Sequence, residues 1–207
     1  MADFLQIHPQ NPQPRLIQQA VDALRKGGII AYPAGTSYAF GAQIGDKQAM
    51  DSIRRIRRLD DNHNFTLLCN DLSQVSTFTK MSNNAHRLIK TLTPGPFTFL
   101  LEATREVPRR LQHPKKKTIG IRIPENAIAR LLVEQLGEPL LTSTLILPGE
   151  EEALADPFEI RQKLDKELEV IIDAGIVEHQ PTTVIACADN AIEIVRQGIG
   201  LAPMLED

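Results

Sequence analysis

The sequence predicts an α/β fold, with one domain built on a sheet that helices cover on both faces. Strand-like and helix-like segments alternate from one end of the chain to the other, and 207 residues are enough to bury one sizeable core. The composition, with 42% hydrophobic and 24% charged residues, is ordinary for a globular protein. We therefore expect a single domain over residues 1–207, with its core spanning residues 15–200.

Hydrophobic spacing defines the elements of the first part of the chain. Leu16, Ala20 and Leu24 recur at intervals of four, which predicts a helix that Asn11 caps and Gly27 ends. A continuous apolar run without helical period indicates a buried strand. These patterns predict a strand at 29–33, a loop from there to Gly41, a helix at 46–58 and a strand at 65–69.

Capping signals help to define the second part. Gly137 follows a helical pattern and is a typical stop residue, while Asp156, Pro157 and Glu159 have the pattern of a capping box. The elements predicted here are helices at 83–92, at 126–136 and after Asp156, and strands at 97–102, 118–123, 139–147, 168–172, 182–187 and 192–196.

Several classes of protein are excluded by what the sequence lacks. No apolar run approaches the roughly 20 residues that span a bilayer, and the first residues lack the pattern of a secretion signal, so we expect a cytoplasmic protein without membrane contact. Cys69 and Cys187 stand in apolar runs without metal-ligand spacing and are expected to be buried. The five histidines show no metal-ligand spacing, so no metal site is expected, and most of them should lie on the surface.

Positive charge is concentrated in the middle of the chain. Residues 51–126 carry 14 Lys and Arg against 7 Asp and Glu, whereas the remaining residues carry 9 against 19. Such a block binds phosphates or nucleic acid when it folds onto one face, or it is spread over solvated faces. The sequence leaves both possibilities open. The residues expected on an RNA-binding surface are Arg54, Arg55, Arg58, Arg109, Arg110, Lys115, Lys116 and Lys117.

Small and hydroxyl residues gather where predicted strands end, which is where open α/β sheets bind ligands. The segments concerned are 31–41, 93–99 and 141–149. The last contains Thr142–Thr144 within an otherwise apolar strand, so at least one of these hydroxyls should face a cleft or a buried partner. Arg122 also stands in an apolar strand and needs an anionic partner, either an internal carboxylate or a ligand.

Taken together, these pieces resemble the YrdC-like family, and most closely its YciO branch. The resemblance extends from Arg15 to Gly200, and the order and spacing of its pieces make it specific. The matching pieces are RLIQQAVDALRKGGIIAYP, Tyr38 with Gly41, NFTLLC, TPGPFTF, KTIGIRIP, LGEPLLTST, PTTVI and VRQGIG.

The resemblance implies a twisted open sheet with a large basic concave surface. Family members are associated with double-stranded RNA, and the family's best-known enzymes make threonylcarbamoyl-adenylate from threonine, bicarbonate and ATP for tRNA modification, usually with magnesium. The positions that match the nucleotide or phosphate site are Arg57, Thr98, Ser143, Thr144 and Arg196. Those that match a small-substrate pocket are Thr36, Tyr38, Thr66, Arg122, Thr182 and Thr183. No catalytic residue is assigned.

The chain departs from the synthases at three places. Their YPT(D/E)T loop reads Tyr32-Pro33-Ala34-Gly35-Thr36 here, which removes a threonine and an acid. Their KxR pair corresponds to Arg57 and Leu59, and their SxN motif corresponds to Thr144 and Ile146. Loss of a cation near a triphosphate removes a charge-assisted hydrogen bond of roughly 1.5–3 kcal/mol, so synthase activity should be weak or absent.

The functional expectation is a YciO-type protein that binds tRNA or double-stranded RNA, or a nucleotide, in a basic cleft and is linked to translation or tRNA modification. ATP, magnesium and L-threonine are ligands that the resemblance allows. Three alternatives remain open at this point: an active threonylcarbamoyl-adenylate synthase, a hydrolase of that adenylate, and a module that binds a protein partner.

Overall fold

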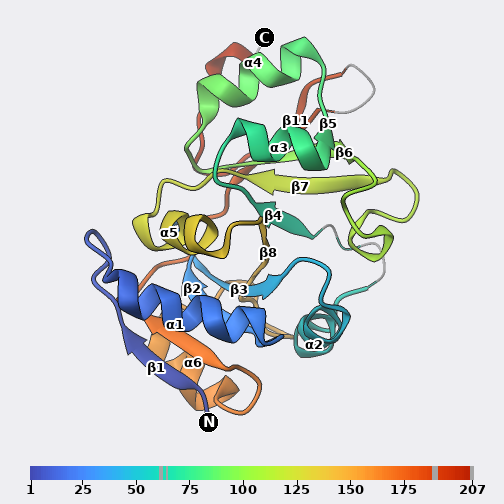
Figure 1. The fold of residues 1–207 in the computed structure, drawn as a ribbon. Coiled ribbons are helices and arrows are strands. Elements are labelled where there is room, and N and C mark those ends of the chain that lie inside the picture. Colours follow the sequence, from blue (N-terminus) through green and yellow to red (C-terminus); the bar gives the residue numbers. More distant parts are fainter. Residues whose placement is uncertain (61–62, 64, 188–190, 206–207) are drawn as a thin grey trace.

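The computed structural model describes residues 1–60, 63, 65–187 and 191–205 (Figure 1). Within these residues one mixed sheet has the strand order β1-β9-β2-β3-β8-β4-β7-β6-β10-β11, and β5 pairs with β6. The strands are β1 (Asp3–Gln6), β2 (Ile30–Pro33), β3 (Tyr38–Gln43), β4 (Thr66–Leu68), β5 (Thr79–Lys80), β6 (Phe97–Ala103), β7 (Thr118–Arg122), β8 (Leu140–Thr144), β9 (Val170–Asp173), β10 (Thr183–Ala186) and β11 (Glu193–Arg196).

Six α-helices and two short 3-10 helices complete this part of the chain. They are α1 (Pro14–Arg25), α2 (Lys47–Arg57), α3 (Leu72–Phe78), α4 (Asn83–Leu92), η1 (Arg109–Leu111), α5 (Ala127–Leu136), α6 (Pro157–Leu164) and η2 (Pro203–Leu205). The predicted α/β class is therefore correct. No helix among the described residues is both long and apolar enough to cross a membrane.

The two faces of the sheet bury separate apolar clusters. Alternate residues of β9 point to opposite faces, so Val170 and Ile172 join one cluster while Ile171 joins the other. The first cluster contains the apolar faces of α1 and α5, which lie side by side in Figure 1. The second contains α2, α4 and α6 together with β6 and β7. Cys69 and Cys187 are buried in this second cluster as free thiols, as expected.

Side-chain caps explain most of the helix starts. Asp46 accepts a hydrogen bond from the Ala49 amide at the start of α2, and Asn126 does the same for the Ala129 amide in α5. Gly137 ends α5 in the left-handed conformation that glycine tolerates, as predicted. The predicted cap of α1 is wrong, because the helix starts two residues after Pro12, at Pro14, with Gln13 before it.

Asp156 caps α6 through the Phe158 amide. The capping-box prediction is only half met, since Glu159 pairs with Lys163 one turn later instead of returning to the cap residue. The elements that were not predicted are strands β1, β3 and β5, helix α3 and the two 3-10 helices. Strand β3 occupies residues 38–43, and its part up to Gly41 was expected to be a loop.

One connection matters for function. β9 and β10 stand far apart in the sheet order, yet only residues 174–182 join them. This segment, called here the crossing segment, therefore passes over the intervening strands. It is fixed along its length, because the Val177 amide donates to the Ala155 carbonyl and the Gln180 amide donates to the Thr36 carbonyl.

Candidate functional site

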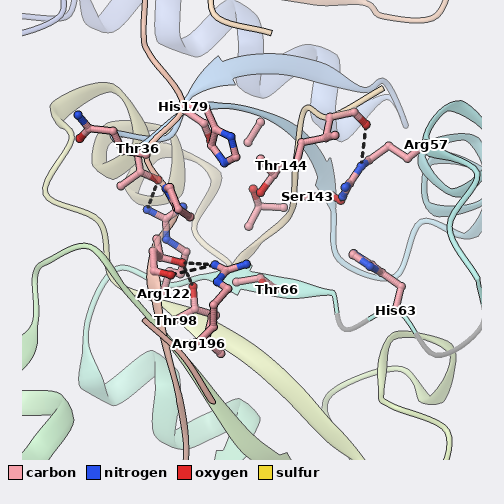
Figure 2. Close-up of a pocket in the computed structure, with 18 of the residues that line it drawn as sticks. Thr36, Arg57, His63, Thr66, Thr98, Arg122, Ser143, Thr144, His179 and Arg196 are labelled. Carbon is pink, nitrogen blue, oxygen red and sulfur yellow. Dashed lines mark hydrogen bonds between the residues drawn. The ribbon is translucent and has the colours of Figure 1, made fainter. Parts of the chain in front are cut away.

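The main pocket is a cavity of about 710 Å³ between the sheet and the crossing segment (Figure 2). Strands β4, β6, β7, β8, β10 and β11 contribute to its walls, as do α2 and the loop before β3. Nine of the eleven residues that the sequence analysis assigned to the nucleotide site and the small-substrate pocket line it. They are Thr36, Arg57, Thr66, Thr98, Arg122, Ser143, Thr144, Thr182 and Arg196.

Arg57 occupies one side of the pocket, at the C-terminal end of α2. Its Nη1 atom donates to Ser143 Oγ over 2.6 Å, and its Nε atom donates to the Ile146 carbonyl over 3.1 Å. Burial lowers the pKa of Arg57 to about 10, so the guanidinium is still charged at neutral pH. This side of the pocket therefore presents a cation of fixed orientation.

Arg122 lies on the opposite side, at the end of β7 (Figure 2). It is 8% exposed, and its Nη2 atom donates to the Ala34 carbonyl over 3.1 Å and to Thr36 Oγ1 over 3.4 Å. The Nε atom is buried without a hydrogen-bond partner. The sequence allowed either an internal carboxylate or a ligand as the partner of Arg122. Among the described residues no carboxylate pairs with Arg122, so the internal ion pair is absent from this part of the chain.

Arg196 brings a third positive charge from β11. Its Nη2 atom donates to the Thr182 carbonyl over 2.9 Å and to Thr182 Oγ1 over 3.3 Å. Thr182 Oγ1 in turn is 2.8 Å from Thr98 Oγ1 on β6. This chain of polar contacts lies on the same side of the pocket as Arg122 (Figure 2).

Tyr38 and Thr183, which match small-substrate positions of the family, are not among the residues that line the pocket. The hydroxyl of Tyr38 donates to the Gly175 carbonyl over 2.8 Å and accepts from the Ala174 amide, which fixes the start of the crossing segment. Thr183 is fully buried and donates to the Gly200 carbonyl. The reason is strand alternation, since Thr182 and Val184 face the pocket and Thr183 faces away.

Two histidines were missed. His63 and His179 both line the pocket, although the sequence gave no spacing that would have set them apart from surface histidines. His179 comes with the crossing segment, and His63 lies on the Arg57 side (Figure 2). Burial, together with the charges of Arg57 and Arg54, lowers the pKa of His63 to about 4. The imidazole is therefore neutral at pH 7.

The residues expected on an RNA-binding surface all lie outside the pocket. Arg54 joins α2 to η1, because its Nη2 atom donates to the Arg110 carbonyl while Arg110 donates to the Gly45 carbonyl. Arg55 points elsewhere and forms an ion pair of 2.7 Å with Glu167. Those with exposed side chains are Arg55, Arg58, Arg109, Arg110, Lys115, Lys116 and Lys117.

Metal ligands are sparse in this part of the molecule. Among the described residues, no group of three His, Cys, Asp or Glu side chains is placed to hold a metal ion. Asp60 and Glu151 line the pocket as separate carboxylates. A magnesium ion at this site would therefore depend on the phosphates of a bound nucleotide for most of its ligands.

Comparison with known proteins identifies the family. The model of the Sua5_yciO_yrdC family, described as telomere recombination, matches residues 22–198. The YciO protein of Escherichia coli (strain K12) is 52% identical over 200 residues, which is 97% of each chain. A threonylcarbamoyl-AMP synthase of Chromobacterium violaceum is 31% identical over 144 residues, 69% of this chain and 74% of its own.

Solved structures agree with this result. The crystal structure of E. coli YciO superposes with a TM-score of 0.95 at 51% identity, covering 99% of this chain and 100% of the other. Sua5 of P. abyssi, in complex with L-threonine, gives a TM-score of 0.86 at 23% identity, over 94% of this chain and 57% of that one, and supports the fold alone. The chain belongs to the Sua5/YciO/YrdC family and is a more distant relative of the threonylcarbamoyl-AMP synthases.

Proposed function

We propose that this chain is a cytoplasmic RNA-binding protein, linked to translation or tRNA modification, with little or no threonylcarbamoyl-adenylate synthase activity. One nucleotide of the bound tRNA or double-stranded RNA occupies the main pocket. The observation that carries the proposal is that Arg57, Arg122 and Arg196 line a single pocket without an ion pair to a carboxylate among the described residues. Fixed guanidinium groups of this kind bind phosphate through charge-assisted hydrogen bonds.

The surroundings of Arg57 favour a polymer over a free nucleotide. Arg57 and Arg54 belong to the same helix, and Arg54 contacts the backbone of Arg110 in η1. Basic side chains therefore continue from the pocket onto the outer surface, where Arg109 and Arg110 are exposed. An RNA strand with one nucleotide in the pocket could place its neighbouring phosphates on this surface.

The same pocket is poorly equipped for adenylate synthesis. Ile146 lines it at the position where the synthases have an asparagine, so an apolar side chain replaces an amide that could bind the nucleotide. Leu59 packs against the hydrophobic core and is absent from the pocket lining, so it supplies no second cation next to Arg57. A transferred adenylyl group needs such charge at the leaving pyrophosphate.

RNA binding is tested by fluorescence anisotropy with tRNA and with a duplex RNA over a range of salt concentrations. We expect an affinity that falls steeply with salt, because each neutralised phosphate releases counterions. Arg109→Glu and Lys116→Glu should reduce both the affinity and the salt slope, whereas Lys26→Glu after α1 is the matched control for a change of net charge. The proposal would be contradicted by an RNA affinity that does not depend on salt, or by the same loss of RNA affinity in all three variants.

Adenylate synthesis is the second candidate, supported by the C. violaceum relative, which is a threonylcarbamoyl-AMP synthase. Pyrophosphate release that requires ATP, threonine and bicarbonate, and that Arg57→Ala abolishes, would establish it. Hydrolysis of the same adenylate is distinguished by supplying the adenylate directly and measuring AMP. RNA binding without either activity supports the first proposal.

A further inference from the structure

Glu151 adds a negative charge to the wall of the main pocket. The residue is exposed, and among the residues that the structure describes its carboxylate forms neither an ion pair nor a hydrogen bond. Its neighbours Glu150 and Glu152 are exposed as well, but they do not belong to the pocket wall. A free carboxylate repels phosphate, so in a pocket that binds RNA it needs hydrogen-bond donors from another part of the nucleotide.

The loop that carries Glu151 is held at both ends. Leu145 and Leu154 are buried, and the Leu154 amide donates to the Leu145 carbonyl over 3.0 Å. Within the loop, the Glu150 amide donates to the Leu147 carbonyl over 3.0 Å and closes a turn. The backbone at Glu151 is therefore fixed relative to the end of β8.

The same loop begins next to Arg57. The Ile146 carbonyl accepts from Arg57 Nε over 3.1 Å, and Ile146 itself lines the pocket. A phosphate bound by Arg57 therefore lies near Ile146, whose apolar side chain can cover the flat face of a base. This part of the wall offers a cation for the phosphate, an apolar surface for the base and, at Glu151, a carboxylate for the edge of the base.

The hydrogen-bonding character of a carboxylate distinguishes between the four bases. A carboxylate only accepts hydrogen bonds, through two oxygens that lie side by side. Guanine has two adjacent donors on its Watson–Crick edge, N1–H and the N2 amino group, and these match the two oxygens. Adenine, cytosine and uracil each have one donor on that edge, next to an acceptor that the carboxylate repels.

Asp60 is the other carboxylate of the pocket wall. It acts on His63, since its charge raises the pKa of that histidine against the effects of burial and of the arginines. His63 lies on the Arg57 side of the pocket (Figure 2). Asp60 is therefore close to the groups that are expected to bind the phosphate, which leaves Glu151 as the carboxylate for the base.

We propose that Glu151 makes the main pocket specific for a guanine nucleotide, by accepting hydrogen bonds from N1–H and from the N2 amino group. The inference rests on the proposed binding of one RNA nucleotide in this pocket and names the base of that nucleotide. Arg57 binds the phosphate and Ile146 contacts the face of the base. A guanine in a duplex uses the same edge to pair with cytosine, so the bound guanine belongs to a loop, a bulge or an end of the RNA.

The test is fluorescence anisotropy with oligouridine RNAs that carry one guanine, one hypoxanthine or one adenine at the same position. The buffer contains EDTA, so that Glu151 cannot act through a magnesium ion. We expect the guanine RNA to bind about five- to a hundredfold more tightly than the adenine RNA, which is the range of a bidentate contact to a base. Hypoxanthine lacks the N2 amino group and should be intermediate. Equal affinity for guanine and adenine, or a preference that appears only with magnesium, would overturn the proposal.

Two neighbouring substitutions provide a matched pair. Glu151→Gln replaces one acceptor by a donor, which is the pattern that adenine matches, so the preference should shift from guanine toward adenine. Glu152→Gln removes the same charge one residue later, outside the pocket wall, and should keep the preference for guanine. The same preference in both variants would contradict the role of Glu151.

Calorimetry with GMP and AMP separates a free nucleotide from RNA as the source of the guanine. If RNA does not bind but GMP binds more tightly than AMP, and Glu151→Gln removes the difference, the proposed RNA binding is wrong and the role of Glu151 is supported. If RNA binds without any preference between the bases, the proposed function stands and the role of Glu151 is wrong.

Discussion

Arg57 and Ser143 are joined by a hydrogen bond of 2.6 Å from Nη1 to Oγ, which connects the end of α2 to β8. With the 3.1 Å bond from Nε to the Ile146 carbonyl, it holds the guanidinium by two edges. The side chain has therefore lost most of its rotamer freedom before any ligand arrives. Such preorganisation lowers the entropic cost of binding a phosphate.

Removal of the Ser143 hydroxyl should weaken RNA binding through Arg57. Ser143→Ala frees one edge of the Arg57 guanidinium, and we expect the affinity for RNA to fall about three- to tenfold. A charge-assisted hydrogen bond contributes about 1.5–3 kcal/mol, and the loss of this one weakens RNA binding only indirectly, through the orientation of Arg57. Anisotropy titrations measure this, with the exposed Ser73→Ala in α3 as control. In an Arg57→Ala background, Ser143→Ala should have no further effect, and independent, additive losses would contradict the coupling.

Restoring an amide should move the pocket toward synthase chemistry. Ile146→Asn puts a donor and an acceptor on the pocket wall, and we expect threonine- and bicarbonate-dependent pyrophosphate release to rise above that of the unmodified chain. Leu59→Arg is the instructive comparison, because Leu59 packs on the core and not on the pocket. It should reduce the free energy of unfolding by about 1–3 kcal/mol without any gain in activity.

The sequence was sufficient to locate the main pocket because buried polar residues in apolar strands are rare. Arg122 and the hydroxyl run Thr142–Thr144 were both identified in this way, and all four residues line the pocket. What it could not supply was the side of a strand on which each hydroxyl lies. Thr182 and Thr183 are adjacent and chemically identical, and only the register of β10 against β6 decides which of them faces the pocket.

Long-range topology accounts for the other differences. Tyr38 was expected in the pocket because it matches a small-substrate position of the family. Its hydroxyl instead anchors the crossing segment, whose path depends on the order of the whole sheet. The same path brings His179 to the pocket. No local pattern encodes that the chain between β9 and β10 passes over the strands between them.

Gly198 should be essential for the position of Thr182. A Cβ atom at Gly198 would lie 2.2 Å from the Pro181 carbonyl oxygen and 2.5 Å from that of Thr182, so the backbone itself would have to move. Gly198→Ala should lower the midpoint of thermal unfolding clearly more than Gly45→Ala. The control has a φ of +89° but open space around it, so strain of about 1 kcal/mol is the only cost there. If calorimetry gave the same decrease in the unfolding midpoint for both variants, the backbone around Gly198 would be able to move away from the added methyl group at little cost.

His63 should make both stability and RNA affinity depend on pH. Its pKa is about 4 in the folded chain because of burial and the charges of Arg57 and Arg54, with Asp60 acting in the opposite direction, against about 6.5 for an unperturbed histidine. Between these two values the unfolded chain binds a proton that the folded chain does not, so stability falls as the pH is lowered through this window, by about 1–3 kcal/mol. Urea unfolding at pH 7 and pH 5 measures the effect, and His63→Gln should reduce it.

A phosphate bound next to Arg57 reverses the electrostatic part of that shift. The anion favours the protonated imidazole, so RNA binding should be accompanied by proton uptake, and the affinity should rise between pH 7 and pH 5 more in the unmodified chain than in His63→Gln. Anisotropy titrations at constant ionic strength compare the two proteins. An identical pH dependence would mean that the bound phosphate does not lie on the Arg57 side of the pocket, where His63 is found (Figure 2).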